Sequence, residues 1–108
     1  MTRRARPASR SHEAAIIDSF RRDPEFAVQY LNEVLAEGDQ DELMLALRRV
    51  SKAFGGIAKL ASDAELNATT LYRTLSRNGN PELRSLIALL RALGMQLAVR
   101  RLPGKRVA

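Results

Sequence analysis

Cysteine is absent from the 108-residue chain, and histidine occurs only once, at His12. The absence of cysteine excludes disulfides, thiolate metal sites and a cysteine nucleophile. The single histidine lies in a basic arm, so we also exclude a His/Cys zinc site, the HExxH motif of metalloproteases and a Ser-His-Asp triad within this chain. We therefore expect no bound metal, no cofactor and no catalytic residue.

Long apolar runs are missing as well. None exceeds five residues, as in Leu86–Leu90, which Arg91 interrupts, whereas a membrane-spanning helix needs about 20 apolar residues. The basic N-terminus is not followed by an uninterrupted apolar segment, which argues against an export signal. Apolar residues make up 45% of the chain and charged residues 28%, a composition typical of a folded domain. We expect a small cytoplasmic binding protein without membrane contact.

Charge is distributed unevenly along the chain. Residues 1–12 hold four arginines and no acid, a charge of +4. Residues 13–42 hold nine acids against two arginines, a charge of −7, and residues 43–108 hold twelve bases against three acids, a charge of +9. This segregation indicates two partners of opposite charge, although two solvated helix faces would give the same pattern.

Apolar spacing and capping residues predict an all-α fold of five to six short helices with a short C-terminal β-strand. We expect a disordered basic arm (1–10), an acidic N-terminal helical extension (11–38), a DNA-binding domain (39–102) and a basic tail (103–108). The expected helices cover 11–22, 24–37, 39–54, 57–62, 68–77 and 81–93. The strand is expected at 95–102, where Leu97 and Val99 alternate with Ala98 and Arg100.

Residues 57–77 have the dimensions of a helix-turn-helix, with Leu71 and Leu75 facing inward on the second helix. Its start combines short polar side chains with an aromatic residue and arginines, which suits insertion into a DNA major groove. The predicted DNA-binding residues are Asn67, Ala68, Thr69, Thr70, Tyr72, Arg73, Ser76 and Arg77, with Lys59 on the preceding helix. An ordinary solvated helix face is the alternative, and Thr70 could instead stabilise the helix start.

Further basic residues flank this motif. Arg48, Arg49, Lys52 and Lys59 are either phosphate contacts or soluble helix surface. The C-terminal bases Arg100, Arg101, Lys105 and Arg106 are either a second DNA-contacting segment or part of a frayed terminus.

A resemblance to the Xre/Cro-type helix-turn-helix, found in lambda-repressor-like domains, lies in Leu60-Ala61-Ser62-Asp63-Ala64-Glu65-Leu66-Asn67-Ala68-Thr69-Thr70-Leu71. From about Asp18 to Val99 the chain also resembles the HigA-type addiction-module antidote proteins. That resemblance lies in Asp23-Pro24, Tyr30-Leu31-Asn32, Glu37-Gly38-Asp39, Leu71-Tyr72-Arg73-Thr74-Leu75-Ser76, Gly79-Asn80-Pro81 and Leu89-Leu90-Arg91-Ala92-Leu93-Gly94. It implies an antitoxin that represses its own operon on double-stranded operator DNA and neutralises an endoribonuclease toxin of the RelE/ParE superfamily.

One residue departs from this motif. Glu65 enters the turn, where the motif commonly has glycine because the backbone is left-handed there. A left-handed glutamate costs about 1 kcal/mol, so we expect the turn to be reshaped. The second helix is also expected to be longer than in ordinary Cro-type domains.

The acidic block predicts a second binding surface. The helix over 24–37 has apolar residues on more than one side, which indicates burial by the domain on one side and by a partner on another. The predicted partner-binding residues are Phe26, Tyr30, Glu33, Val34 and Glu37. The partner is either the toxin or the second protomer of a homodimer, and half-exposed apolar side chains without a partner are the alternative.

Catalysis receives no support from the carboxylates. The groups Asp39/Asp41/Glu42 and Asp63/Glu65 lack a histidine, a glycine-rich phosphate loop and a third metal ligand, and helix capping explains the first group. Besides the antitoxin, two functions stay open: a stand-alone Xre-type regulator, and a protein-interaction module whose helix-turn-helix is only a scaffold.

Overall fold

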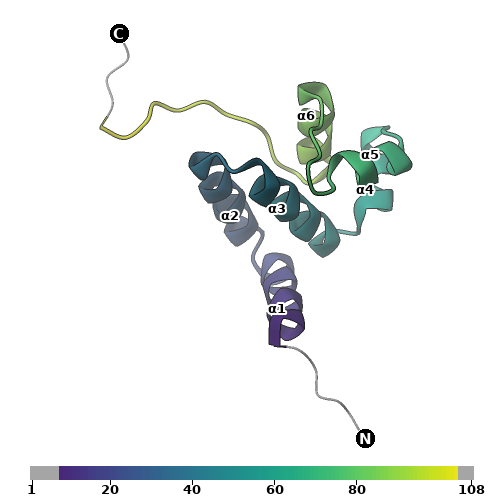
Figure 1. Cartoon of the computed structure of the whole chain (residues 1–108), viewed down its shortest axis with the longest axis horizontal. Coiled ribbons are helices and arrows are strands. Elements are labelled where there is room, and N and C mark those ends of the chain that lie inside the picture. The colour runs from purple at the N-terminus through teal and green to yellow at the C-terminus, as the bar shows by residue number, and fades with distance from the viewer. Residues whose placement is uncertain (1–7, 105–108) are drawn as a thin grey trace, which may run out of the picture.

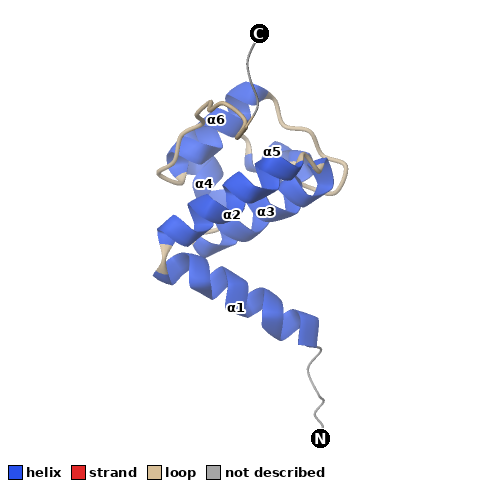
Figure 2. Ribbon diagram, turned by 90° about the vertical axis from the view of Figure 1, so that its left-hand side faces the viewer, coloured by secondary structure: helices blue, strands red, loops and turns tan. Residues whose placement is uncertain are grey.

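Capping residues place several of the helix ends. The computed structural model describes residues 8–104, and in this part of the chain six helices follow one another (Figures 1 and 2): α1 (Ala8–Arg22), α2 (Pro24–Glu37), α3 (Gln40–Ala53), α4 (Ile57–Ala64), α5 (Ala68–Thr74) and α6 (Leu83–Ala92). The Asp39 carboxylate accepts a hydrogen bond from Glu42 N at 3.2 Å, and the Asn67 side chain accepts one from Thr70 N at 2.8 Å. Both predicted N-caps are therefore confirmed, and Gly38 ends α2 with a φ of +76°.

One hydrophobic core joins all six helices. Figure 1 shows α3 between α2 and the group formed by α4, α5 and α6. α3 packs against α1, α2 and α4, and α4 packs in turn against α5 and α6. The largest fully buried apolar side chains come from both halves of the chain: Phe20, Met44, Leu47, Val50, Leu60, Leu75 and Leu89. Since Phe20 of α1 lies in the same core, the acidic N-terminal helices are part of one folded unit with the rest.

Several helix ends differ from those that the sequence predicts. α1 begins at Ala8, α4 continues to Ala64, and α6 begins at Leu83. α5 ends at Thr74 instead of residue 77. Just beyond this end, the Arg48 side chain of α3 hydrogen-bonds the Leu75 carbonyl, and Asn78 turns the chain with a φ of +68°. Residues 1–7 of the expected arm and 105–108 of the expected tail lie outside the described residues.

The β-strand predicted at 95–102 is wrong for the single chain. Met95 N donates to the Leu90 carbonyl at 2.8 Å, and the following residues leave α6 along an irregular path that passes α2 and then extends beyond it (Figure 1). A strand needs a neighbouring strand to complete its hydrogen bonds, and residues 8–104 contain none. Within the same residues, no helix is both long and apolar enough to cross a bilayer.

Candidate nucleic-acid interface

The turn between α4 and α5 is built around a left-handed glutamate. Glu65 has φ +59° and ψ +42°, as its position in the sequence predicts. Its N–H donates to the Ser62 carbonyl at 3.2 Å, and Leu66 N–H donates to the Ala61 carbonyl at 2.7 Å. These two bonds form a Schellman motif, the usual ending of a helix before a left-handed residue. The turn therefore keeps its ordinary shape, and the expected reshaping does not occur.

α5 presents one polar face to solvent. Its inner side is fixed by Leu71 and Leu75, which are 3% and 0% exposed. Thr69, Thr70 and Arg73 are exposed, and Tyr72 shows 55% of its surface. A short helix anchored by two buried leucines can therefore offer these side chains to a ligand with little rearrangement.

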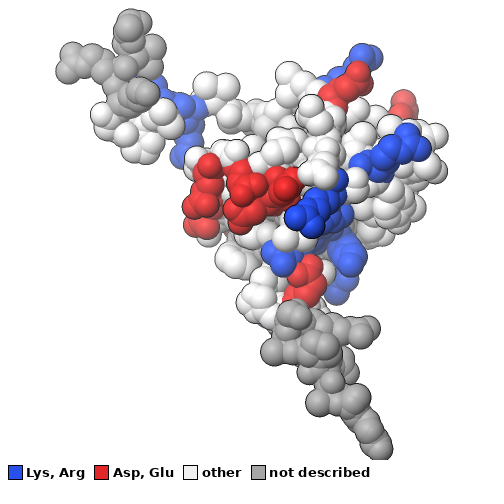
Figure 3. Space-filling view, in the orientation of Figure 1, with Lys and Arg blue, Asp and Glu red and all other residues white. Residues whose placement is uncertain are grey.

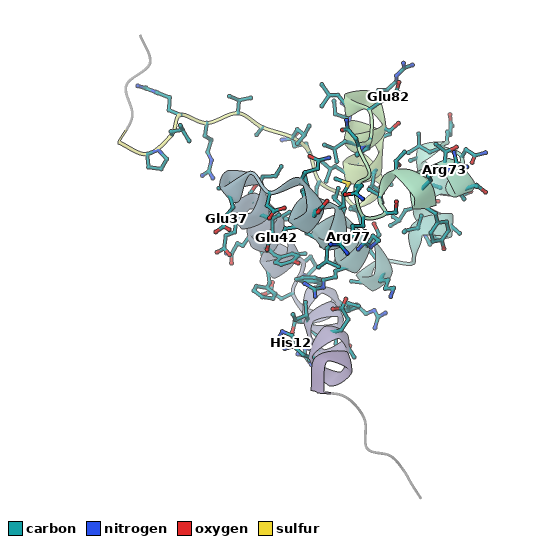
Figure 4. All side chains as sticks on the ribbon, viewed as in Figure 1. His12, Glu37, Glu42, Arg73, Arg77 and Glu82 are labelled. Atoms are coloured by element: carbon teal, nitrogen blue, oxygen red, sulfur yellow. The ribbon has the colours of Figure 1, made fainter. Side chains whose placement is uncertain are left out.

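The predicted DNA-binding residues do not all lie on this face. Ala68 is half-buried, and the Asn67 side chain is occupied as the N-cap of α5. Ser76 and Arg77 follow the end of the helix, and the Ser76 hydroxyl donates to the Arg73 carbonyl at 2.6 Å. Figure 4 shows Arg73 on α5 and Arg77 apart from it, on the same side of the molecule as Glu42. The structure thus groups Thr69, Thr70, Tyr72 and Arg73 and separates Arg77 from them.

Three of the flanking basic residues form contacts within the chain. Lys59 Nζ pairs with Asp63 at 2.7 Å on the surface of α4. Arg48 binds the Leu75 carbonyl, and Arg49 binds Glu13 of α1 and the Tyr30 hydroxyl. The hydrogen bonds from Arg49 lower the pKa of Glu13, and Glu13 raises the pKa of Arg49. Arg48 and Arg49 therefore connect parts of the fold to α3. Their partners Leu75 and Glu13 are 27 and 36 residues away in sequence, so no local sequence pattern predicts these contacts.

An acidic patch lies beside the basic side chains. Acidic side chains gather where α2 ends and α3 begins (Figure 3), and Figure 4 places Glu37 and Glu42 there. Exposed acidic residues of this region are Glu33, Glu37, Asp39, Asp41 and Glu42. The loop after α5 is held against the start of α3, because Gln40 Nε2 donates to the Gly79 carbonyl at 2.9 Å and Asn78 N donates to Asp41 at 3.3 Å. Surfaces of opposite sign therefore adjoin on one face.

The predicted partner-binding residues differ in accessibility. The Tyr30 and Phe20 ring centroids are 5.0 Å apart, and the Tyr30 hydroxyl is 3.0 Å from Arg49 Nη1. Tyr30 therefore makes its main contacts inside the fold. Val34 is half-buried against the core. Phe26 packs 5.5 Å from Phe20 but remains 42% exposed. Together with the exposed Glu33 and Glu37, Phe26 is the accessible part of the predicted surface, and Leu35, 43% exposed, is an additional apolar side chain on α2.

Comparison with known proteins identifies similar sequences. A family model described as "Probable addiction module antidote protein" matches residues 13–101. A protein of Haemophilus influenzae, described as uncharacterized, is 33% identical over 70 residues, which cover 65% of this chain and 71% of that protein. No solved structure matches the chain. The matched segment extends from the acidic helices through α4 and α5 into the segment that follows α6.

Proposed function

Because the chain belongs to the family of probable addiction module antidote proteins, we propose that it is the antitoxin of a type II toxin-antitoxin module. In this proposal α4 and α5 form a helix-turn-helix, and α5 enters the major groove of operator DNA. The observation that carries DNA binding is the exposed start of α5, where Thr69, Tyr72 and Arg73 face solvent while Leu71 and Leu75 hold the helix in the core.

Each side chain of this face has chemistry that suits DNA. A threonine at the second residue of α5 can hydrogen-bond a base edge or contact a thymine methyl group. Arg73 can donate two hydrogen bonds to guanine O6 and N7, and Tyr72 can bind a phosphate through its hydroxyl. In a homodimer, two copies of α5 would occupy successive major grooves, and binding over the promoter would repress the operon.

The acidic patch supports a separate surface for the toxin. Its charge opposes that of DNA, whereas an endoribonuclease of the RelE/ParE superfamily binds RNA and has a basic surface to offer. Glu33 and Glu37 are exposed and can steer such a partner, and Phe26 offers an accessible aromatic anchor. The basic and acidic surfaces give one chain two partners of opposite charge, both in the cytoplasm.

Gel shift with the DNA upstream of the protein's own reading frame tests the DNA-binding part. We expect Arg73→Ala and Thr69→Ala each to weaken operator binding by about 1–3 kcal/mol and to weaken binding to random DNA less. Arg22→Ala is the matched control, since Arg22 is an exposed arginine of α1, a helix without contact to α5. Equal losses on operator and random DNA would reduce Thr69 and Arg73 to phosphate contacts, and unchanged binding would refute the interface.

Co-expression with the product of the neighbouring reading frame tests the toxin-binding part. We expect the chain to co-purify with that protein and to suppress its toxicity, and we expect Glu33→Lys with Glu37→Lys to abolish both effects while operator binding persists. If the double variant still co-purifies with the toxin and still suppresses its toxicity, the toxin surface lies elsewhere. Operator binding without any toxic neighbour would favour the stand-alone regulator, and toxin binding without operator binding would favour the interaction module.

A further inference from the structure

The segment after α6 carries a strand pattern without a strand partner. Residues 96–102 follow the last helical hydrogen bonds, and none of their backbone groups pairs with another backbone group in the described part of the chain. Leu97 is 38% exposed and Val99 is 99% exposed, although both are apolar. Unpaired backbone and exposed alternating apolar side chains together form a template for pairing with another strand.

We propose that residues 95–102 pair antiparallel with the same residues of a second copy of this chain, with the twofold axis at Ala98, and that this two-stranded ribbon is the dimer interface. The inference deepens the proposed function, because it specifies the contact that holds the two DNA-binding copies together. The segment first passes α2, with which Met95 and Leu97 line a groove, and then extends beyond the helices (Figure 1). Because Leu97 and Val99 keep exposed surface there, a second copy can approach the segment without displacing a helix.

The side chains of this segment are complementary to themselves in that register. With Ala98 opposite Ala98, Leu97 of each copy lies across from Val99 of the other, on the same face of the ribbon. Arg100 lies across from Gln96, and Arg101 across from Met95, so no two arginines are directly opposed. A register centred on Arg100 or Arg101 would place like charges together, which is unfavourable.

The surface next to the segment suits the same occupant. Val28, Leu31 and Leu35 of α2 line an apolar groove together with Met95 and Leu97. Pairing places Val99 of the second copy beside Leu97 along this groove, where its side chain leaves water. The ribbon also carries Arg101 of the second copy back toward α2, which has no basic residue that would repel it.

Sedimentation equilibrium of the full chain tests the interface. We expect a dimer for the unaltered protein and a dissociation constant raised by roughly 100-fold or more in Val99→Asp, because each dimer buries two copies of Val99. Val99 is 99% exposed in the single chain, so this change leaves the folded monomer intact. Leu83→Asp on α6, a change of the same kind at a residue that is 64% exposed, should leave the dimer unaltered. A monomeric unaltered protein, or a Val99→Asp protein that dimerises normally, would overturn the proposal.

A single introduced cysteine tests the register, because the chain has no other. Under mild oxidation, Ala98→Cys should yield a covalent dimer, since directly opposed residues of an antiparallel pair have Cα atoms about 4.5–5.5 Å apart. Leu83→Cys should yield none, and equal cross-linking at both sites would overturn the register. These results are independent of the proposed function: a monomer that binds operator and suppresses the toxin refutes only the ribbon, and a cross-linked dimer that does neither refutes only the antitoxin.

Discussion

Arg49 of α3 and Glu13 of α1 form a bidentate ion pair between helices that lie far apart in sequence. Arg49 Nη2 is 2.7 Å from Glu13 Oε1, and Nε is 2.9 Å from both carboxylate oxygens. The remaining guanidinium nitrogen, Nη1, donates to the Tyr30 hydroxyl of α2 at 3.0 Å. One side chain thereby connects the three helices that form the N-terminal half of the fold.

We expect Arg49→Ala to lower the free energy of unfolding by about 1–3 kcal/mol, because it leaves Glu13 and Tyr30 without their charged partner. Urea denaturation of Arg49→Ala, Glu13→Ala and the double variant gives the coupling between the two residues. Lys59→Ala is the control, since the Lys59–Asp63 pair is an exposed pair on one helix, for which we expect about 0.5 kcal/mol or less. Additive losses in the double variant would show that the ion pair contributes nothing.

The lowered pKa of Glu13 predicts how this contribution depends on pH. A carboxyl group whose pKa is lower in the folded state stabilises the protein above its unfolded pKa and loses that contribution as pH falls through the folded pKa. We therefore expect the stability difference between the unaltered protein and Glu13→Gln to be greatest near about pH 7 and to shrink toward about pH 3. Urea denaturation across this range measures the difference, and a difference that stays constant would contradict the assignment.

Glu65 keeps a left-handed conformation that glycine adopts without a Cβ penalty. We expect Glu65→Gly to raise the free energy of unfolding by about 0.5–1 kcal/mol, because the strain of the left-handed glutamate is removed. Ala64→Gly is the matched control: Ala64 is the last residue of α4 and has no positive φ, so the same replacement should destabilise the protein. Thermal unfolding of both variants measures the two changes in stability. A less stable Glu65→Gly protein would contradict the prediction that the left-handed glutamate is strained.

Ser51 is fully buried in α3, and its hydroxyl has no hydrogen-bond partner among the described residues. We expect Ser51→Ala to raise the free energy of unfolding by about 1 kcal/mol, because the uncompensated desolvation of the hydroxyl disappears and alanine has the higher helix propensity. Ser62→Ala, at an exposed position of α4, should change stability by only the propensity difference. A destabilised Ser51→Ala protein would reveal a hydrogen bond that the hydroxyl makes in solution.

The proposed DNA-binding interface predicts that operator affinity depends strongly on salt concentration. If the dimer neutralises roughly 6–10 phosphates, affinity should fall by about three to five decades between about 50 and about 200 mM salt, because bound cations are released from the DNA. Titrations of labelled operator at several salt concentrations give the slope. A flat dependence would contradict a basic interface on DNA, whatever the affinity at one salt concentration.

The sequence by itself determined the features that depend on neighbouring residues. Asp39 and Asn67 cap their helices through bonds to the third residue beyond, Gly38 ends α2, and the left-handed state of Glu65 follows from its place between two helices. The order of the short motifs between Asp23 and Gly94 was also enough to recognise the antidote family. Such features are local, because each involves groups within one turn of the chain, and their energies hardly depend on the rest of the fold.

Only the tertiary structure decided which side chains remain accessible. Arg48 and Arg49 look like candidate phosphate contacts in the sequence, but partners 27 and 36 residues away bind them, and the Arg48 contact accompanies the early end of α5. Tyr30 is likewise withdrawn from the predicted partner surface by Phe20 and Arg49. The alternating pattern at 95–102 forms no strand in the structure, because the energy of a strand resides in hydrogen bonds to a neighbour that residues 8–104 do not supply.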